Sequence, residues 1–349
     1  MSIIAAIIGC GENSPGKGAW HSVGYAHAWA YQRCPEVRII SAADRIKKNI
    51  DDFTNEFYGI KGYQDYKEML QAEHPDIVSI CAFPRYREEM VNEAINARVK
   101  AIWIEKPFAP ELGTARRMME KAKQGNVRLF LNHQRRYGKP FEWLRDAVKE
   151  KRIGELASFD VQTADANIMD FGSHLIDAAL FCIGERRPVN VYSGIDVTSI
   201  NKKHDLSFPE HIIASVHFND GCRMTFEGGE PNSDYMPILR AQGTDGFAEI
   251  YLNIPSGANS IFRALYKGEK EVFNPSTDEH FHSGDDPALY ISRAAQDIVQ
   301  AMNTDKPTRI DISEAYRGLE IMIGILEAGR LNSKIEFPVL QEAFPLDVQ

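Results

Sequence analysis

Residues 3–11 read Ile-Ile-Ala-Ala-Ile-Ile-Gly-Cys-Gly, a short apolar run that ends in two glycines one residue apart. A run of this length, bounded by glycine, is typical of a strand buried on both faces of a parallel sheet. Glycines directly after such a strand allow backbone amides to approach a pyrophosphate at the start of the next helix. The stretch therefore predicts a βα turn in which Gly9 and Gly11 contact a dinucleotide.

The chain continues this pattern up to about residue 133. Further β-branched runs alternate with stretches of helical periodicity, as in βαβ units that cover a parallel sheet. The expected strands are Ile3–Ile8, Val37–Ala43, Ile77–Ala82, Ala101–Ile104 and Val127–Leu131, and the expected helices are Asp65–Ala72, Arg87–Ala97 and Leu112–Lys123. Residues 1–133 are thus predicted to form an α/β Rossmann domain with a doubly wound parallel sheet.

After about residue 150, longer strand-like runs follow one another, and the turn Asn219-Asp220-Gly221 is a hairpin signal. The runs are Leu156–Thr163, Val189–Val197, His211–Phe218, Cys222–Phe226, Gly246–Tyr251 and Ile261–Tyr266, followed by expected helices at Pro287–Asn303 and Ser313–Leu331. We expect residues 134–349 to form an α+β domain with a large, mainly antiparallel, open-faced sheet for substrate binding and oligomerisation. The C-terminal helices can pack back on the first domain. An exposed sheet face favours a homodimer or homotetramer.

Asp44 ends the second expected strand. An acid at this place accepts hydrogen bonds from the ribose hydroxyls of NAD and repels the 2′-phosphate of NADP. Arg45 beside it weakens that preference, because a guanidinium can stack on adenine or bind the extra phosphate. The alternative is an ordinary tight turn in which Asp44 caps a helix. We expect NAD as cofactor, with NADP possible.

The glycine fingerprint is irregular. Ser14 stands where the third glycine belongs, and Gly24 is the next glycine that fits a helix start. About ten residues, Glu12 to His21, are therefore inserted. Two alternatives remain: a surface loop, or a loop that folds over the pyrophosphate with Lys17 or backbone amides as donors.

Three later motifs, with the glycines and Asp44, resemble the glucose–fructose oxidoreductase and inositol dehydrogenase (Gfo/Idh/MocA) family over nearly the whole chain. The motifs are Glu105-Lys106-Pro107, Asn132-His133-Gln134-Arg135-Arg136-Tyr137 and Asp170-x-Gly172-x-His174-x-x-Asp177, with Gly243-Thr244-Asp245-Gly246 further on. The resemblance implies that Lys106 orients the substrate hydroxyl and the nicotinamide, that His174 relays the proton, and that Asp170 is a further substrate or relay ligand. Pro84, Glu105 and Lys106 are implied to lie at the cofactor.

The chemistry of hydride transfer asks for these residue types. When hydride leaves a carbon, the proton of the attached hydroxyl must leave as well, and a cation stabilises the developing oxyanion. Histidine titrates near neutral pH and suits proton transfer. In a helix from Asp170 to about Cys182, Asp170, His174 and Asp177 lie at i, i+4 and i+7 on one stripe, which would face a pocket. The alternative makes Asp170 a helix cap, His174 an interior residue and Asp177 a solvated acid.

Some features depart from the family pattern or allow two interpretations. The usual threonine-proline-asparagine turn is replaced by Phe83-Pro84-Arg85-Tyr86-Arg87, and Asp165-Ala166-Asn167 replaces the glycines expected before the second-domain motif. Arg135 and Arg136, with Asp177, are tentative substrate ligands. The arginines would bind a carboxylate or, alternatively, pair with surface acids. His280 and His282, near Asp285 and Asp286, lack a third metal ligand fixed by spacing, so we expect no metal.

Composition excludes several classes of protein. The formal charge of −9 argues against a nucleic acid partner, and no apolar run approaches the length of a membrane helix. The five cysteines show no pairing pattern and are expected to be reduced and mostly buried. The apolar start lacks the basic residues of a signal peptide, so we expect a cytoplasmic protein.

The sequence thus predicts NAD(P)-dependent hydride transfer between a nicotinamide cofactor and a hydroxyl or ketone of a sugar, cyclic polyol or sugar derivative. A first alternative is a redox-neutral lyase or glycosidase-type enzyme that holds NAD tightly and returns the hydride. A second is a cofactor-binding sensor without turnover.

Overall fold

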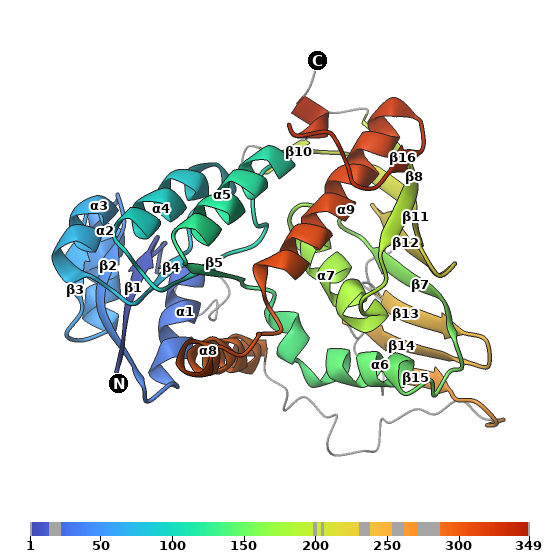
Figure 1. Cartoon of the computed structure of the whole chain (residues 1–349), viewed down its shortest axis with the longest axis horizontal. Coiled ribbons are helices and arrows are strands. Elements are labelled where there is room, and N and C mark those ends of the chain that lie inside the picture. Colours follow the sequence, from blue (N-terminus) through green and yellow to red (C-terminus); the bar gives the residue numbers. More distant parts are fainter. Residues whose placement is uncertain are drawn as a thin grey trace. The chain divides into compact units, whose positions relative to one another are not determined.

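The computed structural model describes residues 2–13, 22–197, 201–203, 206–229, 238–252, 262–270 and 287–347. The chain divides into two compact units (Figure 1). The first comprises Met1–Tyr137 and Asp286–Tyr316, and the second comprises Gly138–Asp285 and Arg317–Gln349. The chain therefore enters the second unit after Tyr137, returns to the first unit at Asp286 and enters the second unit again at Arg317.

The first unit contains a six-stranded parallel sheet in the order β3-β2-β1-β4-β5-β6. Its strands are β1 (Ile3–Ile8), β2 (Val37–Ala43), β3 (Lys61–Tyr63), β4 (Ile77–Ile80), β5 (Ala101–Ile104) and β6 (Arg128–Leu131). The order reverses between β1 and β4, which is the crevice where dinucleotides bind in doubly wound sheets. The predicted Rossmann fold is confirmed.

The helices of this unit cover the sheet. They are α1 (Val23–Gln32), α2 (Lys47–Glu56), α3 (Tyr66–Glu73), α4 (Pro84–Asn96), α5 (Leu112–Gln124) and α8 (Pro287–Thr304), with the short η1 (Gln134–Tyr137) after β6. Helix α8 packs against α1 and η1, although it comes from the C-terminal part of the chain. The fold of this unit therefore needs residues far beyond Tyr137.

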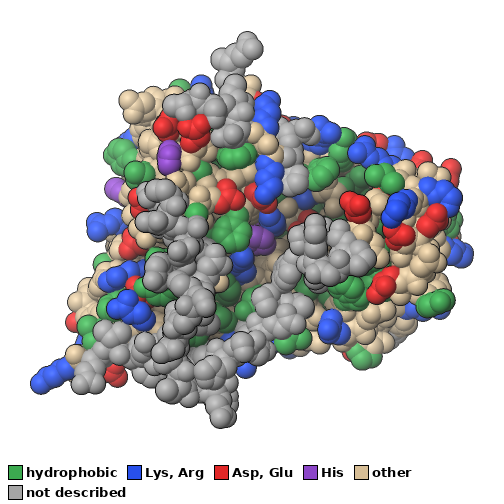
Figure 2. All heavy atoms as spheres, turned by 180° about the vertical axis from the view of Figure 1, so that it is seen from behind, with side chains coloured by type: hydrophobic (Ala, Val, Ile, Leu, Met, Phe, Trp, Pro, Cys, Tyr) green, Lys and Arg blue, Asp and Glu red, His purple; other side chains and the backbone are tan. Residues whose placement is uncertain are grey.

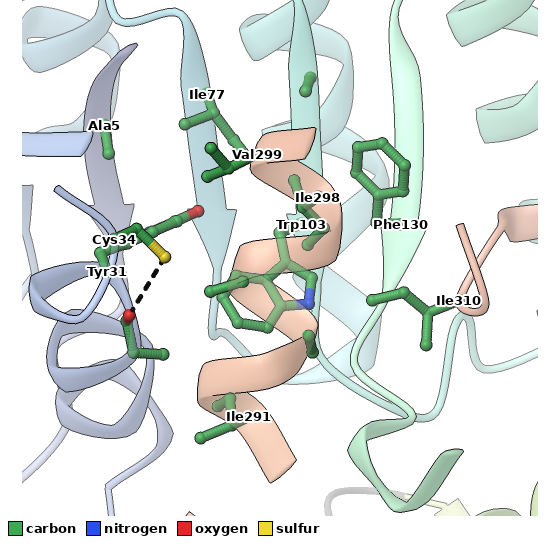
Figure 3. Packing of buried hydrophobic residues seen from close by; sticks show 14 of the residues in the cluster. Ala5, Tyr31, Cys34, Ile77, Trp103, Phe130, Ile291, Ile298, Val299 and Ile310 are labelled. Carbon is green, nitrogen blue, oxygen red and sulfur yellow. Dashed lines mark hydrogen bonds between the residues drawn. The ribbon is translucent and has the colours of Figure 1, made fainter. Parts of the chain in front are cut away.

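The apolar face of α8 explains this packing. Buried residues Ile291, Ala294, Ala295, Ile298 and Val299 follow the spacing i, i+3, i+4, i+7 and i+8. They share one core cluster with the fully buried side chain of Trp103 from β5, and Figure 3 shows Ile298 beside Trp103. Each isoleucine buried in this way contributes about 1.5–3 kcal/mol relative to exposure.

The second unit is built on an eight-stranded sheet in the order β15-β14-β13-β7-β12-β11-β8-β16. Its strands are β7 (Leu156–Thr163), β8 (Pro188–Asp196), β11 (His211–Phe218), β12 (Arg223–Gly228), β13 (Ile238–Gly243), β14 (Phe247–Tyr251), β15 (Phe262–Leu265) and β16 (Ile335–Glu336), while β9 (Asn201–Lys203) and β10 (Leu206–Phe208) form a separate pair. Only β7 and β12 pair in parallel among the described strands of this sheet. The predicted large, mainly antiparallel sheet is confirmed.

Helices α6 (Lys139–Lys149) and α7 (Phe171–Ile183) pack together, and α7 contacts β7 and β12 (Figure 1). Helix α9 (Ile312–Leu331) and the short η2 (Pro345–Asp347) follow α8 in the chain. Along β11, Ile212, Ala214 and Val216 are buried, whereas Ile213 is 65% exposed. This alternation gives the sheet one packed face and one open face. At the predicted hairpin, Gly221 has φ 88°, a value that favours glycine.

The charges on the surface, the character of the helices and the burial of the cysteines can be compared with the expectations from composition. On the face drawn in Figure 2, basic and acidic side chains are interspersed. None of the helices in the described part of the chain has both the length and the apolar character that a bilayer crossing requires. The five cysteines, all of which lie in the described part of the chain, form no disulfide, and four of them are buried, in agreement with the predicted burial.

Candidate active site

The glycines after β1 adopt conformations that other residues disfavour. Gly9 has φ 90° and Gly11 has φ 75°. A Cβ atom on Gly24, near the start of α1, would lie 2.5 Å from the Gly9 carbonyl oxygen and 2.6 Å from that of Cys10. Only glycine permits this approach of helix to strand. Gly24 thus follows the inserted segment and packs α1 against the end of β1.

The remaining expected cofactor residues lie at the carboxyl ends of neighbouring strands. Asp44 follows β2, Pro84 is the first residue of α4 after β4, and Glu105 follows β5. Parallel strands bring these positions to one edge of the sheet, beside the reversal between β1 and β4. The first unit therefore gathers Gly9, Gly11 and these residues at the edge where doubly wound sheets bind ligands.

Asp44 holds the glycine turn. Its Oδ2 accepts a hydrogen bond from the Gly11 amide at 3.0 Å, and its Oδ1 accepts one from the Ile46 amide at 2.9 Å. The guanidinium carbon of Arg45 lies 6.0 Å from the ring centroid of Tyr86, within range of a cation–π contact. Part of the acceptor capacity of Asp44 is therefore used within the protein.

The turn that carries Lys106 is held by a buried arginine. The Arg87 Nε donates to the Ala82 carbonyl at 2.8 Å, and the guanidinium also donates to the carbonyls of Glu105, Pro107 and, at 3.2 Å, Lys106. Burial lowers the pKa of Arg87 to about 10, a shift that the nearby charge of Glu105 opposes. Lys106 itself is partly buried.

Glu105 points into a polar network inside the unit. Its Oε1 accepts from Asn132 Nδ2 at 2.6 Å and lies 2.9 Å from His27 Nε2, while His27 Nδ1 lies 2.9 Å from the Ser79 hydroxyl. Burial of the carboxyl raises its pKa, but the hydrogen bonds from His27 and Asn132, together with electrostatic attraction to His27 and Arg87, lower the pKa of Glu105 overall. Glu105 is thus an anion held beneath the turn that carries Lys106.

The second motif lies on α7 in the second unit. Asp170 directly precedes the helix, and its carboxylate forms an ion pair with Lys203 of β9 that raises the pKa of the lysine. A Cβ on Gly172 would lie 3.2 Å from the Phe226 ring, so the motif glycine packs closely against β12. His174 is 8% exposed and Asp177 is 1% exposed. The alternative of a solvated Asp177 is therefore wrong.

Other predicted residues have different outcomes. Arg136 is 4% exposed, donates to the Arg309 carbonyl at 2.8 Å and lies 3.6 Å from Glu314. Of the two alternatives for these arginines, a substrate carboxylate or a surface acid, Arg136 pairs with an acid. Burial lowers the pKa of Arg135 to about 10. Lys17 and nearly all of the inserted segment, as well as His280, His282, Asp285 and Asp286, lie outside the described residues.

Sequence reasoning missed the polar residues that support the site. Arg87 was placed in a helix, and His27 and Ser79 were not singled out. A signal was present, because Ser79 interrupts the apolar run Ile-Val-Ser-Ile and is fully buried. A polar side chain in a central buried strand needs a partner, but the sequence does not show which one.

Comparison with known proteins agrees with this geometry. Residues 4–133 match the model of the oxidoreductase family with an NAD-binding Rossmann fold, Gfo/Idh/MocA. An uncharacterised oxidoreductase of Schizosaccharomyces pombe is 30% identical over 37% of this chain and 39% of its own length. Myo-inositol 2-dehydrogenase of Thermotoga maritima is 24% identical over 47% of this chain and 52% of its own length. The chain thus spans about two fifths to half of the length of these curated relatives.

The likeness in fold extends over nearly the whole chain. The WlbA dehydrogenase of Bordetella pertussis, in complex with NADH and UDP-GlcNAcA, has a TM-score of 0.78 at 15% identity and covers 97% of this chain and 100% of its own. Its similarity shows the common fold. Over residues 4–133, this chain matches the NAD-binding Rossmann domain of the Gfo/Idh/MocA oxidoreductase family, the family that its motifs resemble.

Proposed function

We propose that this protein is an NAD-dependent oxidoreductase that transfers a hydride between the cofactor and a hydroxyl or ketone of a sugar, cyclic polyol or sugar derivative. The observation that carries the proposal is the sheet edge at which Gly9 and Gly11 follow β1, Asp44 follows β2 and the Lys106 turn follows β5. A glycine cradle beside a positioned lysine suits a cofactor and a reacting oxygen together.

The residues present fit NAD. Gly9 and Gly11 allow the tight turn, because a Cβ at Gly9 would crowd the main chain of Cys81 and a Cβ at Gly11 would clash with the Ser22 hydroxyl. The turn and the start of α1 would hold the pyrophosphate, and Asp44 would accept the ribose hydroxyls. When bound, NAD supplies the carbon that accepts the hydride. The carboxylate of Asp44 favours NAD over NADP, since it would repel a 2′-phosphate.

Three side chains of the protein would act on the substrate. The Lys106 ammonium would stabilise negative charge at the substrate oxygen. His174 would accept the hydroxyl proton, for which a group that titrates near neutral pH is suited. Asp170, ion-paired with Lys203, would bind a second hydroxyl or assist the relay. In the reverse direction, the same groups would return the proton to a ketone.

The relatives support a carbohydrate-like substrate. Matching proteins include a myo-inositol 2-dehydrogenase, a D-apiose dehydrogenase and a D-glucoside 3-dehydrogenase. The substrates named there are polyhydroxylated and carry hydroxyls on neighbouring carbons, which suit recognition by carboxylates and a cation. The predicted homodimer or homotetramer is a further expectation, which light scattering on the purified chain tests.

The test is an absorbance screen for NADH formation over inositols, aldoses, glycosides and sugar acids, each with NAD and with NADP. We expect reduction of NAD by at least one polyol or sugar. Substrate consumption without net NADH would support the redox-neutral alternative. Binding of NAD without any consumption across the screen would support the sensor and contradict the proposal.

A further inference from the structure

Arg87 holds the main chain on both sides of Lys106. Its guanidinium donates to the carbonyl of Glu105, which precedes Lys106, and to the carbonyl of Lys106 itself. It also donates to the next carbonyl, that of Pro107, while its Nε donates to Ala82. One side chain therefore joins the ends of β4 and β5 and anchors both peptide groups that flank Lys106.

The third main-chain group of this turn is also engaged. The Lys106 amide donates to Glu105 Oε2 at 3.2 Å, and Glu105 Oε1 is held by Asn132 and His27. With the flanking carbonyls and the amide all bonded, the φ and ψ angles of Lys106 have little freedom. Because the direction of a Cα–Cβ bond follows from the backbone, the starting direction of the lysine side chain is fixed as well.

We propose that Arg87 is a positioning residue that acts through Lys106, setting the direction from which the ammonium reaches the substrate oxygen. This inference rests on the proposed function, in which Lys106 stabilises the reacting oxygen. Displacement of a catalytic group by about 1 Å can cost roughly 10²-fold in rate, so an anchor at the backbone of that group has catalytic consequences.

The position requires arginine in particular. Arg87 is 3% exposed, and its N–H groups donate to four main-chain carbonyls that follow β4 and β5. A guanidinium presents five N–H groups in a flat fork, whereas a lysine ammonium presents three from a single point. A lysine at position 87 would keep the positive charge but could not donate hydrogen bonds to Ala82 and to the Lys106 turn at the same time.

The test compares Arg87→Lys with the matched control Arg128→Lys. Arg128 also donates to two main-chain carbonyls, those of Ala301 and Lys306, but away from the Lys106 turn. We expect Arg87→Lys to lower kcat about 10- to 100-fold with NAD affinity within about threefold, and Arg128→Lys to keep kcat within about twofold. In a Lys106→Ala background, Arg87→Lys should change the remaining kcat less than about twofold, because the two residues act as one unit.

A loss of kcat that is equally large with and without Lys106 would overturn the proposal, since it would reveal a general structural role. Unchanged kcat in Arg87→Lys would overturn it as well. The melting temperature shows whether each variant is folded. If Arg87→Lys does not fold, Arg87→Gln is tested in its place, and the same outcomes support or overturn the proposal.

A second readout is independent of turnover. Competitive acetylation, read by mass spectrometry, compares the reaction rate of Lys106 with that of the exposed Lys123 on α5. We expect the rate at Lys106 to change at least threefold in Arg87→Lys while the rate at Lys123 stays the same. An unchanged Lys106 rate contradicts positioning, whereas absence of any substrate in the screen contradicts the proposed function alone.

Discussion

His27 Nε2 and Glu105 Oε1 lie 2.9 Å apart inside the first unit, although 78 residues separate them in the chain. Ser79 and Asn132 complete this network from β4 and from the turn after β6. The network links helix α1, which packs against the end of β1 at Gly24, to the residue that precedes Lys106. The packing of α1 against the turn after β1 and the turn that carries Lys106 therefore share one buried support.

Replacement of His27 by alanine should lower the free energy of unfolding by about 3–5 kcal/mol. The change opens a cavity in the fully buried space beside Trp103 and leaves a buried carboxylate without one partner. Urea unfolding measures the effect. His217→Ala, at an exposed position on β11, is the control and should stay within about 0.5 kcal/mol. A stable His27→Ala protein would mean that the network contributes little to stability.

Stability should depend on pH through Glu105. Its hydrogen bonds lower its pKa in the folded state, so the ionised form favours folding. This contribution is fully present above the unfolded value of about 4.3 and is lost as the pH falls through the lower folded value. Glu105→Gln should be less stable at neutral pH and lose less stability between about pH 5 and 3, measured by denaturant unfolding at each pH. The exposed Glu56→Gln should retain the wild-type pH profile, and an identical profile for Glu105→Gln would refute this prediction.

Gly24→Ala should disturb the turn after β1, where we propose that NAD binds. The new methyl group would lie within 2.6 Å of two carbonyl oxygens, so α1 must move away from β1. We expect a loss of about 1–3 kcal/mol in stability from overpacking, and NAD binding weakened at least about tenfold. Gly194→Ala on β8 is the control, because its Cβ meets no atom within 4 Å. Calorimetric titration measures the NAD affinity, and equal affinities for wild type and Gly24→Ala would show that the close packing of α1 against β1 does not support NAD binding.

Asp44 should determine the choice of cofactor. We expect the wild type to bind NAD more tightly than NADP by roughly 1–3 kcal/mol. Asp44→Asn retains an oxygen acceptor for the Gly11 amide but removes the charge, so its preference should shrink while the turn persists. Asp51→Asn, which alters an exposed ion pair on α2, serves as control. Tighter binding of NADP by the wild type would indicate that Arg45 dominates.

The sequence was most informative where a local pattern is sufficient. The strands at Ile3–Ile8 and Ala101–Ile104 have the predicted bounds, because apolar runs that end in Gly9 or Glu105 mark them clearly. Strand β3 was missed, since Lys61–Tyr63 is short and contains a glycine. Helix α2 was missed because only Ile50 and Phe53 are apolar among its ten residues.

Contacts between distant segments could not be predicted. Nothing local pairs His27 with Glu105, or Arg87 with the carbonyls around Lys106, because such partners follow from strand order. Strand β13 was also missed, as its inward residues Leu239 and Ala241 give only a weak alternation. The motif residues around Lys106 and His174 could be singled out because each motif lies within one turn or one helix, where residue spacing alone fixes which residues are neighbours.

Turnover of Lys106→Ala and His174→Ala, on the best substrate of the wild type, tests the proposed chemistry most directly. Each variant should lose about 10²–10⁴-fold in kcat while binding NAD within a few-fold of wild type, as expected for groups that act on charge and protons at the substrate. Stopped-flow measurement of NADH formation gives kcat, and calorimetric titration gives the affinity for NAD. Near-normal kcat in either variant, with the protein folded and NAD bound, would remove that residue from the mechanism and contradict the proposed reaction site.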